Sequence, residues 1–305
     1  MSFAPSAPLV RAENFAVAGP IAVAGSLRFA DLELVAIDGA EQAHVELTAS
    51  GPRGAELLST VSIIGDPSRL AIDVPVTWGI LGPRAKLSVR ISVPTGSTID
   101  LSTSSGDMSA LGGYAVASLH TGSGDLRLDR AETASLHTGS GDVQVGSSAL
   151  LNARSGSGDI RVDSSGTAEL RAGSGSVTVG QLSAGGDVHS GSGRLSVAQA
   201  SGVLKLVTGS GGITIGSTDG QIHAKSGSGS VTVENATAGT LRLASSSGRL
   251  RIAVAYGTAT LVDASSSSGR VTSELESLPG SEGFERTLEL HARSSSGSIT
   301  ISRAQ

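Results

Sequence analysis

The sequence predicts an all-β protein that folds as a parallel β-solenoid, a coil of short strands similar to a β-helix or β-roll. Three observations lead to this prediction. A Gly-rich unit recurs along most of the 305 residues, and apolar and polar residues alternate on both sides of each unit. Only 2% of the residues are aromatic, whereas 38% are hydrophobic. A thin core of Val, Ile, Leu and Ala suits stacked coils better than a thick globular domain.

The repeated unit is a Ser-Gly or Gly-Gly corner followed by an apolar-polar-apolar triplet. Most intervals between successive corner glycines are 17 or 18 residues, and the last three are 19, 21 and 28. The eleven corner glycines are Gly106, Gly124, Gly141, Gly158, Gly175, Gly193, Gly211, Gly229, Gly248, Gly269 and Gly297. Each interval is too short for a useful helix, so we expect two short strands and two turns in each. Glycine is expected at the corner because it allows a tight turn of the backbone.

Apolar residues alternate with polar ones on both sides of each corner. Leu126, Arg127 and Leu128 follow Gly124, while Ala134 and Leu136 precede the next corner. A period of two is typical of a strand with one buried face. One coil cannot bury its inward side chains alone, so each strand is expected to pair in parallel with its equivalent one coil later. We expect a right-handed coil by analogy with parallel crossovers.

The spacing of the repeat divides the chain into segments. Residues 1–12 are expected to form a flexible N-terminal arm, and residues 13–100 atypical opening coils that cap the solenoid. Residues 51–84 contain four prolines and are expected to be irregular. Regular coils are expected over 101–303, with a polar loop inserted near 273–287. A cap is expected because an open parallel edge would template aggregation.

Composition excludes several classes of function. The chain has no Cys, which excludes disulfide frameworks, zinc fingers and thiol catalysis. A net charge of −5 argues against a nucleic-acid partner. The N-terminus lacks a basic segment followed by an apolar one, and no apolar run is long enough to span a bilayer. The sequence therefore predicts a cytoplasmic location, no membrane insertion and no cofactor.

Stacking would align four carboxylates that each follow a corner glycine: Asp107, Asp125, Asp142 and Asp159. Neighbours in such a row lie roughly 5 Å apart, and like charges at that distance repel by about 1 kcal/mol in a water-like dielectric. The row is a weak candidate for calcium binding. The favoured interpretation is that each Asp accepts hydrogen bonds from N–H groups at the corner.

A second row lies four residues before the corner glycine and is mostly basic: His120, His137, Arg154, Arg171 and His189. We take it as a candidate binding surface. A solvated face of mixed charge is the favoured interpretation. The alternatives are an anionic partner such as an acidic polysaccharide, and a metal ion shared by His120 and His137. A third, outward row rich in Thr is expected from strand propensity alone.

Several motifs carry a family resemblance. They are T-G-S-G-D-L-R-L at 121–128, T-G-S-G-D-V-Q-V at 138–145, S-G-S-G-D-I-R-V at 155–162, the lead-in at 93–103 and the ending at 290–301. From about residue 13 to 303 the sequence resembles the bacterial DUF4097 family, whose members are labelled as candidate adhesins. The resemblance implies a β-solenoid without an established enzymatic activity, and it implies a location at the cell surface.

We therefore predict a non-catalytic structural or interaction module, an adhesin-like rigid rod that binds a protein or glycan partner through outward polar rows. One alternative is a cytoplasmic scaffold that self-associates. Another is a carbohydrate-active β-helix enzyme. The sequence contains no nucleophile elbow on a strand–turn–helix, no phosphate loop and no dinucleotide-binding glycine pattern, so an enzyme is not predicted.

Overall fold

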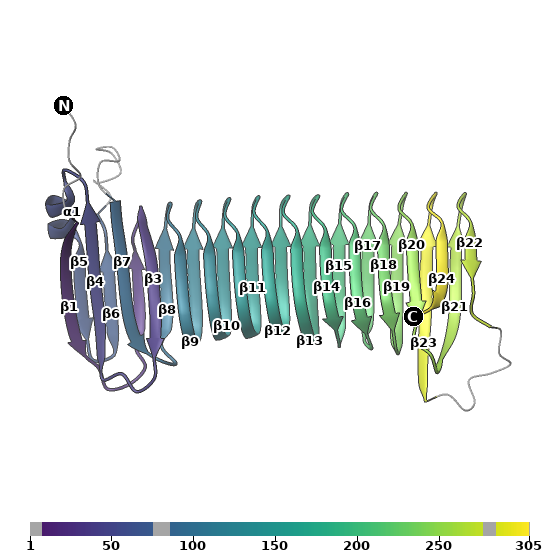
Figure 1. Ribbon diagram of the computed structural model, residues 1–305, viewed down its shortest axis with the longest axis horizontal. Helices are drawn as coiled ribbons and strands as arrows, with labels where there is room; N and C mark the ends of the chain where they lie inside the picture. The colour runs from purple at the N-terminus through teal and green to yellow at the C-terminus, as the bar shows by residue number, and fades with distance from the viewer. Residues whose placement is uncertain (1–7, 76–85, 277–284, 305) are drawn as a thin grey trace. The chain divides into compact units, whose positions relative to one another are not determined.

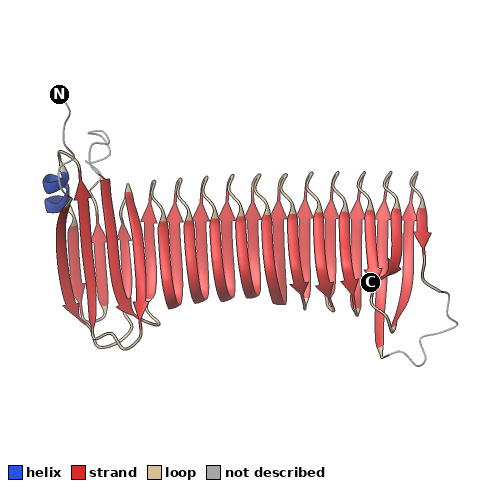
Figure 2. Ribbon diagram, viewed as in Figure 1, coloured by secondary structure: helices blue, strands red, loops and turns tan. Residues whose placement is uncertain are grey.

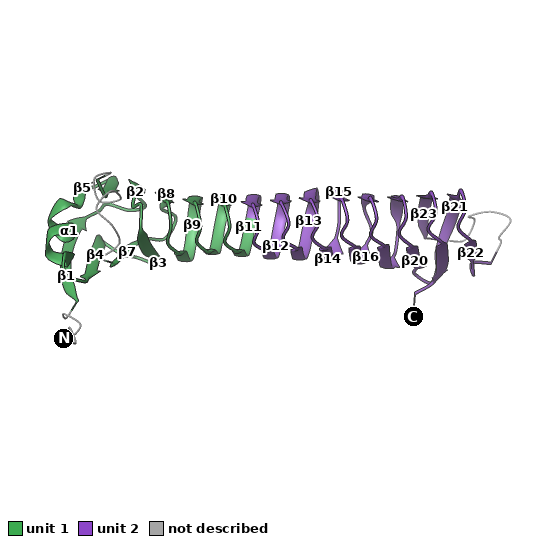
Figure 3. Cartoon of the chain, turned by 90° about the horizontal axis from the view of Figure 1, so that it is seen from above, with its two compact units in different colours: residues 1–148 green, residues 149–305 purple. Residues whose placement is uncertain are grey.

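A computed structural model describes residues 8–75, 86–276 and 285–304. The chain divides into two compact units, Met1–Ser148 and Ala149–Gln305 (Figure 3). Within the described ranges every regular element is a strand except one short helix, α1 (Gly54–Thr60) (Figure 2). Parallel pairing of successive coils dominates, which confirms the predicted all-β solenoid class. In the part of the chain that the structure describes, no helix has the length and apolarity needed to cross a bilayer.

The second unit consists of stacked coils. Each coil contributes one strand to each of two facing sheets (Figure 1). The β14 sheet contains, in spatial order, β14 (Leu195–Ala200), β16 (Ile213–Thr218), β18 (Val231–Ala236), β20 (Leu250–Val254), β24 (Ile299–Arg303) and β22 (Val271–Ser273). The β15 sheet contains β15 (Val203–Thr208), β17 (Gln221–Ser226), β19 (Gly239–Ser245), β23 (Arg286–Ser294) and β21 (Thr258–Ser266). β12 (Ile160–Ala172) and β13 (Val177–Ser190) each run through a bend and contribute to both sheets.

Side chains between the two sheets form the core. Leu195, Ile213 and Val231 are aligned in the β14 sheet and are at most 1% exposed. Leu204, Ile222 and Leu241 form the equivalent row in the β15 sheet. These are the positions that alternation predicted. Each coil adds one inward residue where it bends, which the sequence pattern did not indicate: Leu182, Ala200, Thr218 and Ala236.

The last coils do not stack in chain order. β23 lies between β19 and β21, and β24 lies between β20 and β22, so the coil of β21 and β22 is at the edge (Figure 1). Residues 277–284 of the predicted loop insertion are outside the described residues. The inserted coil carries Leu288, Leu290, Ile299 and Ile301, all buried, whereas β22 consists of Val271, Thr272 and Ser273, all exposed. Placing the more apolar coil between two neighbours buries more apolar surface.

The first unit combines parallel coils with antiparallel strands. Its strands are β1 (Leu9–Ala16), β2 (Ala22–Ser26), β3 (Ala30–Ile37), β4 (Gln42–Ser50), β5 (Ser62–Asp66), β6 (Arg69–Asp73), β7 (Lys86–Pro94), β8 (Thr98–Thr103), β9 (Met108–Thr121) and β10 (Leu126–Thr138). β11 (Val143–Ser155) spans the boundary between the units. β9 and β10 pair in parallel, as do β3 with β7 and β2 with β8. β4 pairs antiparallel with both β1 and β7, and β5 pairs antiparallel with β6.

Two expectations for the N-terminal segment were wrong. Residues 9–12, expected in a flexible arm, form the start of β1 and pair with 46–49 of β4. Part of the Pro-rich segment, expected to be irregular, forms α1, whose Leu57 and Leu58 are buried. Arg11 on β1 links the two elements. Its guanidinium donates hydrogen bonds to the carbonyl oxygens of Leu58 at 2.9 Å and Val61 at 2.8 Å. The bonds satisfy carbonyls at the end of the helix.

The corner glycines are required by close approach rather than by backbone conformation. Among the eleven, only Gly106 has a left-handed φ, at 143°. A Cβ added at Gly211 would collide with the carbonyl oxygen of Gly193, and one at Gly229 would collide with that of Gly211. Glycine is therefore selected because successive corners stack with their backbones in contact.

A Ser or Thr hydroxyl, buried in most coils, lies three residues before every corner glycine except Gly175, where Ala172 takes its place. Ser226 Oγ accepts a hydrogen bond from the N–H of Gly229 at 2.8 Å and donates one to the carbonyl oxygen of Gly211 at 2.9 Å. The same two bonds recur at Thr138, Ser190, Thr208 and Ser245. Each hydroxyl thus links one corner to the corner of the preceding coil and satisfies buried backbone groups.

Substituting Gly211 tests this stacking. We expect Gly211→Ala to lower the free energy of unfolding by about 3 kcal/mol, because the new methyl group would force neighbouring coils apart. Gly212→Ala is the matched control, since a Cβ there lies 3.5 Å from its nearest neighbour, the carbonyl oxygen of Ser230. Chemical denaturation followed by circular dichroism measures both. Equal effects of the two substitutions would contradict stacking by backbone contact.

Candidate functional site

The predicted basic row begins in the first unit with two stacked imidazoles. His120 and His137 occupy aligned positions on β9 and β10. Their ring centroids are 4.8 Å apart and the planes are inclined by 6°. Parallel stacked rings direct their nitrogen atoms side by side rather than toward a common point. The arrangement is a ladder of side chains on the outside of a sheet.

In the second unit the same row is interleaved with carboxylates. Arg154 and Arg171 lie 3.2 and 3.0 Å from the same Oε1 of Glu169. His189 Nε2 lies beside Asp187 Oδ1, and Asp187 Oδ2 lies 3.6 Å from Lys205 Nζ. All of these side chains are solvent-exposed to some degree, so each pair contributes little to stability. The carboxylates neutralise most of the positive charge of this part of the row.

The predicted row of aspartates forms hydrogen bonds with the backbone of neighbouring coils. Asp125 N–H donates to Asp107 Oδ1 at 2.9 Å, and Asp142 N–H donates to Asp125 Oδ1 at 2.8 Å. In the second unit, Ser176 N–H donates to Asp159 Oδ1 at 2.8 Å. These bonds stabilise the corners and offset the repulsion between adjacent carboxylates. The described ranges contain no group of three or more His, Asp or Glu side chains suited to a metal ion.

A cluster of charges on β21 and β23 was not identified from the sequence. Arg293 donates to both carboxylate oxygens of Asp263, at 2.8 and 2.6 Å. His291 lies 3.3 Å from Asp263 Oδ2 and 2.8 Å from Glu289 Oε1. A signal was present, because Asp263 and His291 both lie six residues before a corner glycine. The predicted basic row included only the position four residues before the corner glycine.

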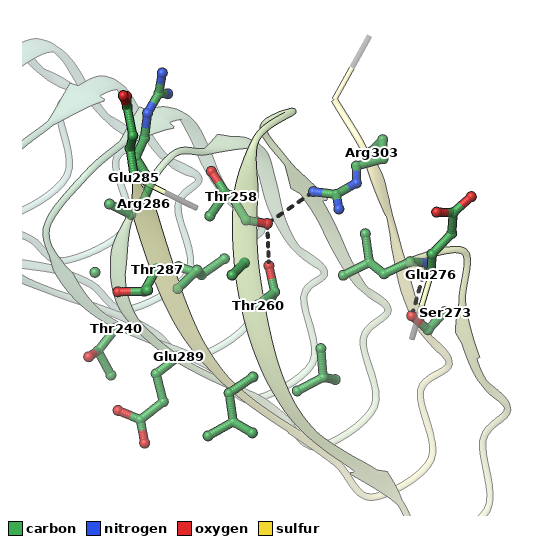
Figure 4. A pocket seen from close by; sticks show the side chains of 17 residues that line it. Thr240, Thr258, Thr260, Ser273, Glu276, Glu285, Arg286, Thr287, Glu289 and Arg303 are labelled. Carbon is green, nitrogen blue, oxygen red and sulfur yellow. Dashed lines mark hydrogen bonds between the residues drawn. The ribbon is translucent and has the colours of Figure 1, made fainter. Parts of the chain in front are cut away.

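A pocket of about 1090 Å³ lies beside this cluster, at the start of β21 and β23 (Figure 4). Its lining includes the hydroxyls of Thr240, Thr258 and Thr260. Arg303 donates a hydrogen bond to the carbonyl oxygen of Thr258 at 3.3 Å. Figure 4 shows Glu276 and Glu289 separated across the pocket.

The cluster on β21 and β23 changes the pKa of its members. Hydrogen bonds from Arg293 and then His291 lower the pKa of Asp263 to about 2. Hydrogen bonds to Glu289 and then Asp263 raise the pKa of the His291 imidazole. The contribution of His291 to stability is full below its unfolded pKa and is lost as pH rises through the folded pKa. That of Asp263 is present above its unfolded pKa and is lost as pH falls toward 2.

Removing Asp263 should therefore change the titration of His291. We expect Asp263→Asn to lower the pKa of His291, because the variant removes one of the two carboxylates that stabilise the imidazolium. Asp187→Asn is the matched control: it removes the carboxylate beside His189 on the same sheet and should leave His291 unchanged. Titration of the imidazole protons by NMR measures both. A pKa of His291 unaltered by Asp263→Asn would contradict the geometry.

Several solved bacterial structures are similar to this chain. A candidate adhesin from Bacteroides fragilis is 13% identical, with a TM-score of 0.33, and the match covers 96% of this chain and 97% of that one. One from Parabacteroides merdae is 12% identical, with a TM-score of 0.36 and coverage of 96% and 95%. A candidate lipid-binding protein from Parabacteroides distasonis is 12% identical, with a TM-score of 0.33 and coverage of 98% of both chains.

No curated protein matches the sequence. A protein family does match, twice in succession, over residues 31–164 and 149–304. The two matches together span the repeats, from β3 to the end of β24. They agree with the coil structure described above and with the resemblance carried by the corner motifs. The chain belongs to the Toastrack DUF4097 family.

Proposed function

We propose that this protein is a non-catalytic interaction module that binds a protein or glycan partner through the outward side chains of its coils. The observation that carries the proposal is the alignment of these side chains. Parallel pairing places Asp187, Lys205, His223 and Arg242 next to one another on the outer face of the β15 sheet. Hydrogen-bonded strands hold the row at a spacing of about 4.8 Å.

Ordered rows of this kind favour recognition over catalysis. The backbone of each coil is fixed by its neighbours, so a partner meets side chains that are already positioned, which reduces the entropy lost on binding. The aspartates of the corner row are used in backbone hydrogen bonds. The pocket at β21 and β23 separates Glu276 from Glu289 (Figure 4). These features support a binding surface rather than an active site.

Photo-crosslinking tests the proposal. A benzophenone amino acid at Val203, on the outer face of the β15 sheet, is expected to crosslink a partner from native lysate or a glycan library. Asp219, in the turn between β16 and β17, is the control position. Bound glycans should keep their length, because no hydrolysis is expected. Crosslinks confined to the control position, or shortening of the glycan by the pure protein, would contradict the proposal.

The edge coil favours self-association as a second candidate function. Among the described residues, no strand covers the outer edges of β21 and β22. Leu261 is 69% exposed on β21, and Val262 and Val271 are also exposed. The one charged residue of β21, Asp263, is already neutralised by Arg293. An edge strand without a free charge lacks the usual protection against pairing, so β21 can pair with β21 of a second copy.

A lysine on the edge strand should prevent that pairing. We expect Leu261→Lys to convert a concentration-dependent dimer into a monomer, because an edge lysine disfavours strand addition. Val203→Lys is the matched control: Val203 is 63% exposed, but both edges of β15 are paired. Light scattering after size exclusion gives the mass. A wild-type chain that stays monomeric at every concentration would exclude this candidate.

A further inference from the structure

Four basic side chains gather on three consecutive strands of the β15 sheet. They are Lys205 on β15, His223 and Lys225 on β17, and Arg242 on β19, and all four are exposed. We call this group the basic patch. Lys205 is aligned with His223, and His223 with Arg242, so these three form one row across adjacent strands. Lys225 lies two residues after His223 on the same face of β17.

Three of the four residues in the basic patch lack a carboxylate within ion-pair distance. Arg154 and Arg171 share Glu169, and Arg293 is held by Asp263. Within the patch, Lys205 alone has a carboxylate nearby, that of Asp187 at 3.6 Å. His223, Lys225 and Arg242 form no ion pair with any residue in the described ranges.

The basic patch gathers four basic side chains on three adjacent strands of a chain whose net charge is −5. In the row, Lys205 and Arg242 are two strand spacings apart, about 9.6 Å, with His223 between them. Lys205, Lys225 and Arg242 repel one another, and among the described residues no carboxylate forms an ion pair with Lys225 or Arg242. An anion placed across the three strands would relieve it. The patch therefore fits a ligand with several negative charges along the direction in which the coils stack.

The surroundings of the patch limit what kind of anion fits. Exposed Gln221 and half-buried Thr240 lie beside the row and can form hydrogen bonds with hydroxyl groups. None of β15, β17 and β19 carries Phe, Tyr or Trp, the large rings on which the bases of single-stranded nucleic acid usually stack. All three strands are paired on both sides, so a peptide cannot be added as a further strand.

We propose that the basic patch binds a carboxylated polysaccharide that runs across β15, β17 and β19. A pyranose residue is about as long as the strand spacing, so successive acidic sugars match successive strands. Lys225 and Arg242 would contact carboxylates, and Gln221 and Thr240 would contact hydroxyl groups. This inference rests on the proposed function and assigns both its ligand class and its surface.

Binding of hexagalacturonate to the full chain tests the inference. Lys225→Gln combined with Arg242→Gln should weaken binding at least tenfold in calorimetry, because two charge-assisted contacts are lost. Arg249→Gln combined with Arg251→Gln is the matched control. It removes the same charge from the β14 sheet at the same level of the solenoid, and should change the affinity less than twofold. Cellohexaose, a neutral hexasaccharide, should bind at least tenfold more weakly than hexagalacturonate.

Three results would overturn the inference. Equal losses in the two double variants would show non-specific attraction by charge. Failure of wild-type protein to bind hexagalacturonate would exclude the ligand class, while crosslinks from Val203 would still support the proposed function. Tighter binding of a single-stranded DNA 12-mer, lost in the patch variant, would assign the patch to nucleic acid instead. Absence of both hexagalacturonate binding and crosslinks would remove both proposals.

Discussion

The contact between successive corner glycines determines how the coils of each unit stack. The backbone of one corner lies against the carbonyl oxygen of the corner before it, leaving no space for a Cβ. A buried Ser or Thr then bonds to both corners. Because these contacts set the distance between coils, they also set the parallel ladder and the spacing of every outward row. Ala172 interrupts the hydroxyl row without interrupting the coil, so the glycine contact is the stricter requirement.

The stacked coils convert residues far apart in sequence into close neighbours. Asp187 and Lys205 are paired across adjacent strands, and Asp263 and Arg293 across two coils that are out of chain order. The same geometry leaves Lys225 and Arg242 without a carboxylate within ion-pair distance among the described residues, so this part of the β15 sheet presents net positive charge.

Part of the candidate surface could be predicted from the repeat alone. The outward basic row was identified at His120, His137, Arg154, Arg171 and His189, and the structure places these residues on the outside of the sheets. Their partners were missed because carboxylates six residues before the corner were not compared with bases four residues before it. The position of a side chain was predictable, but its counter-charge depends on which coil lies beside it.

By itself, the sequence determined the class of fold, the period of the coil and the inward residues, because glycine spacing and alternation are local signals. Tertiary structure decided three things that local patterns do not encode. It placed β23 and β24 between the coil of β19 and β20 and the edge coil of β21 and β22. Their larger apolar side chains are better buried in this position. It paired β1 with β4 in antiparallel fashion. It also selected which charges are neutralised, since ion pairs depend on contacts between coils rather than on the order of residues in one coil.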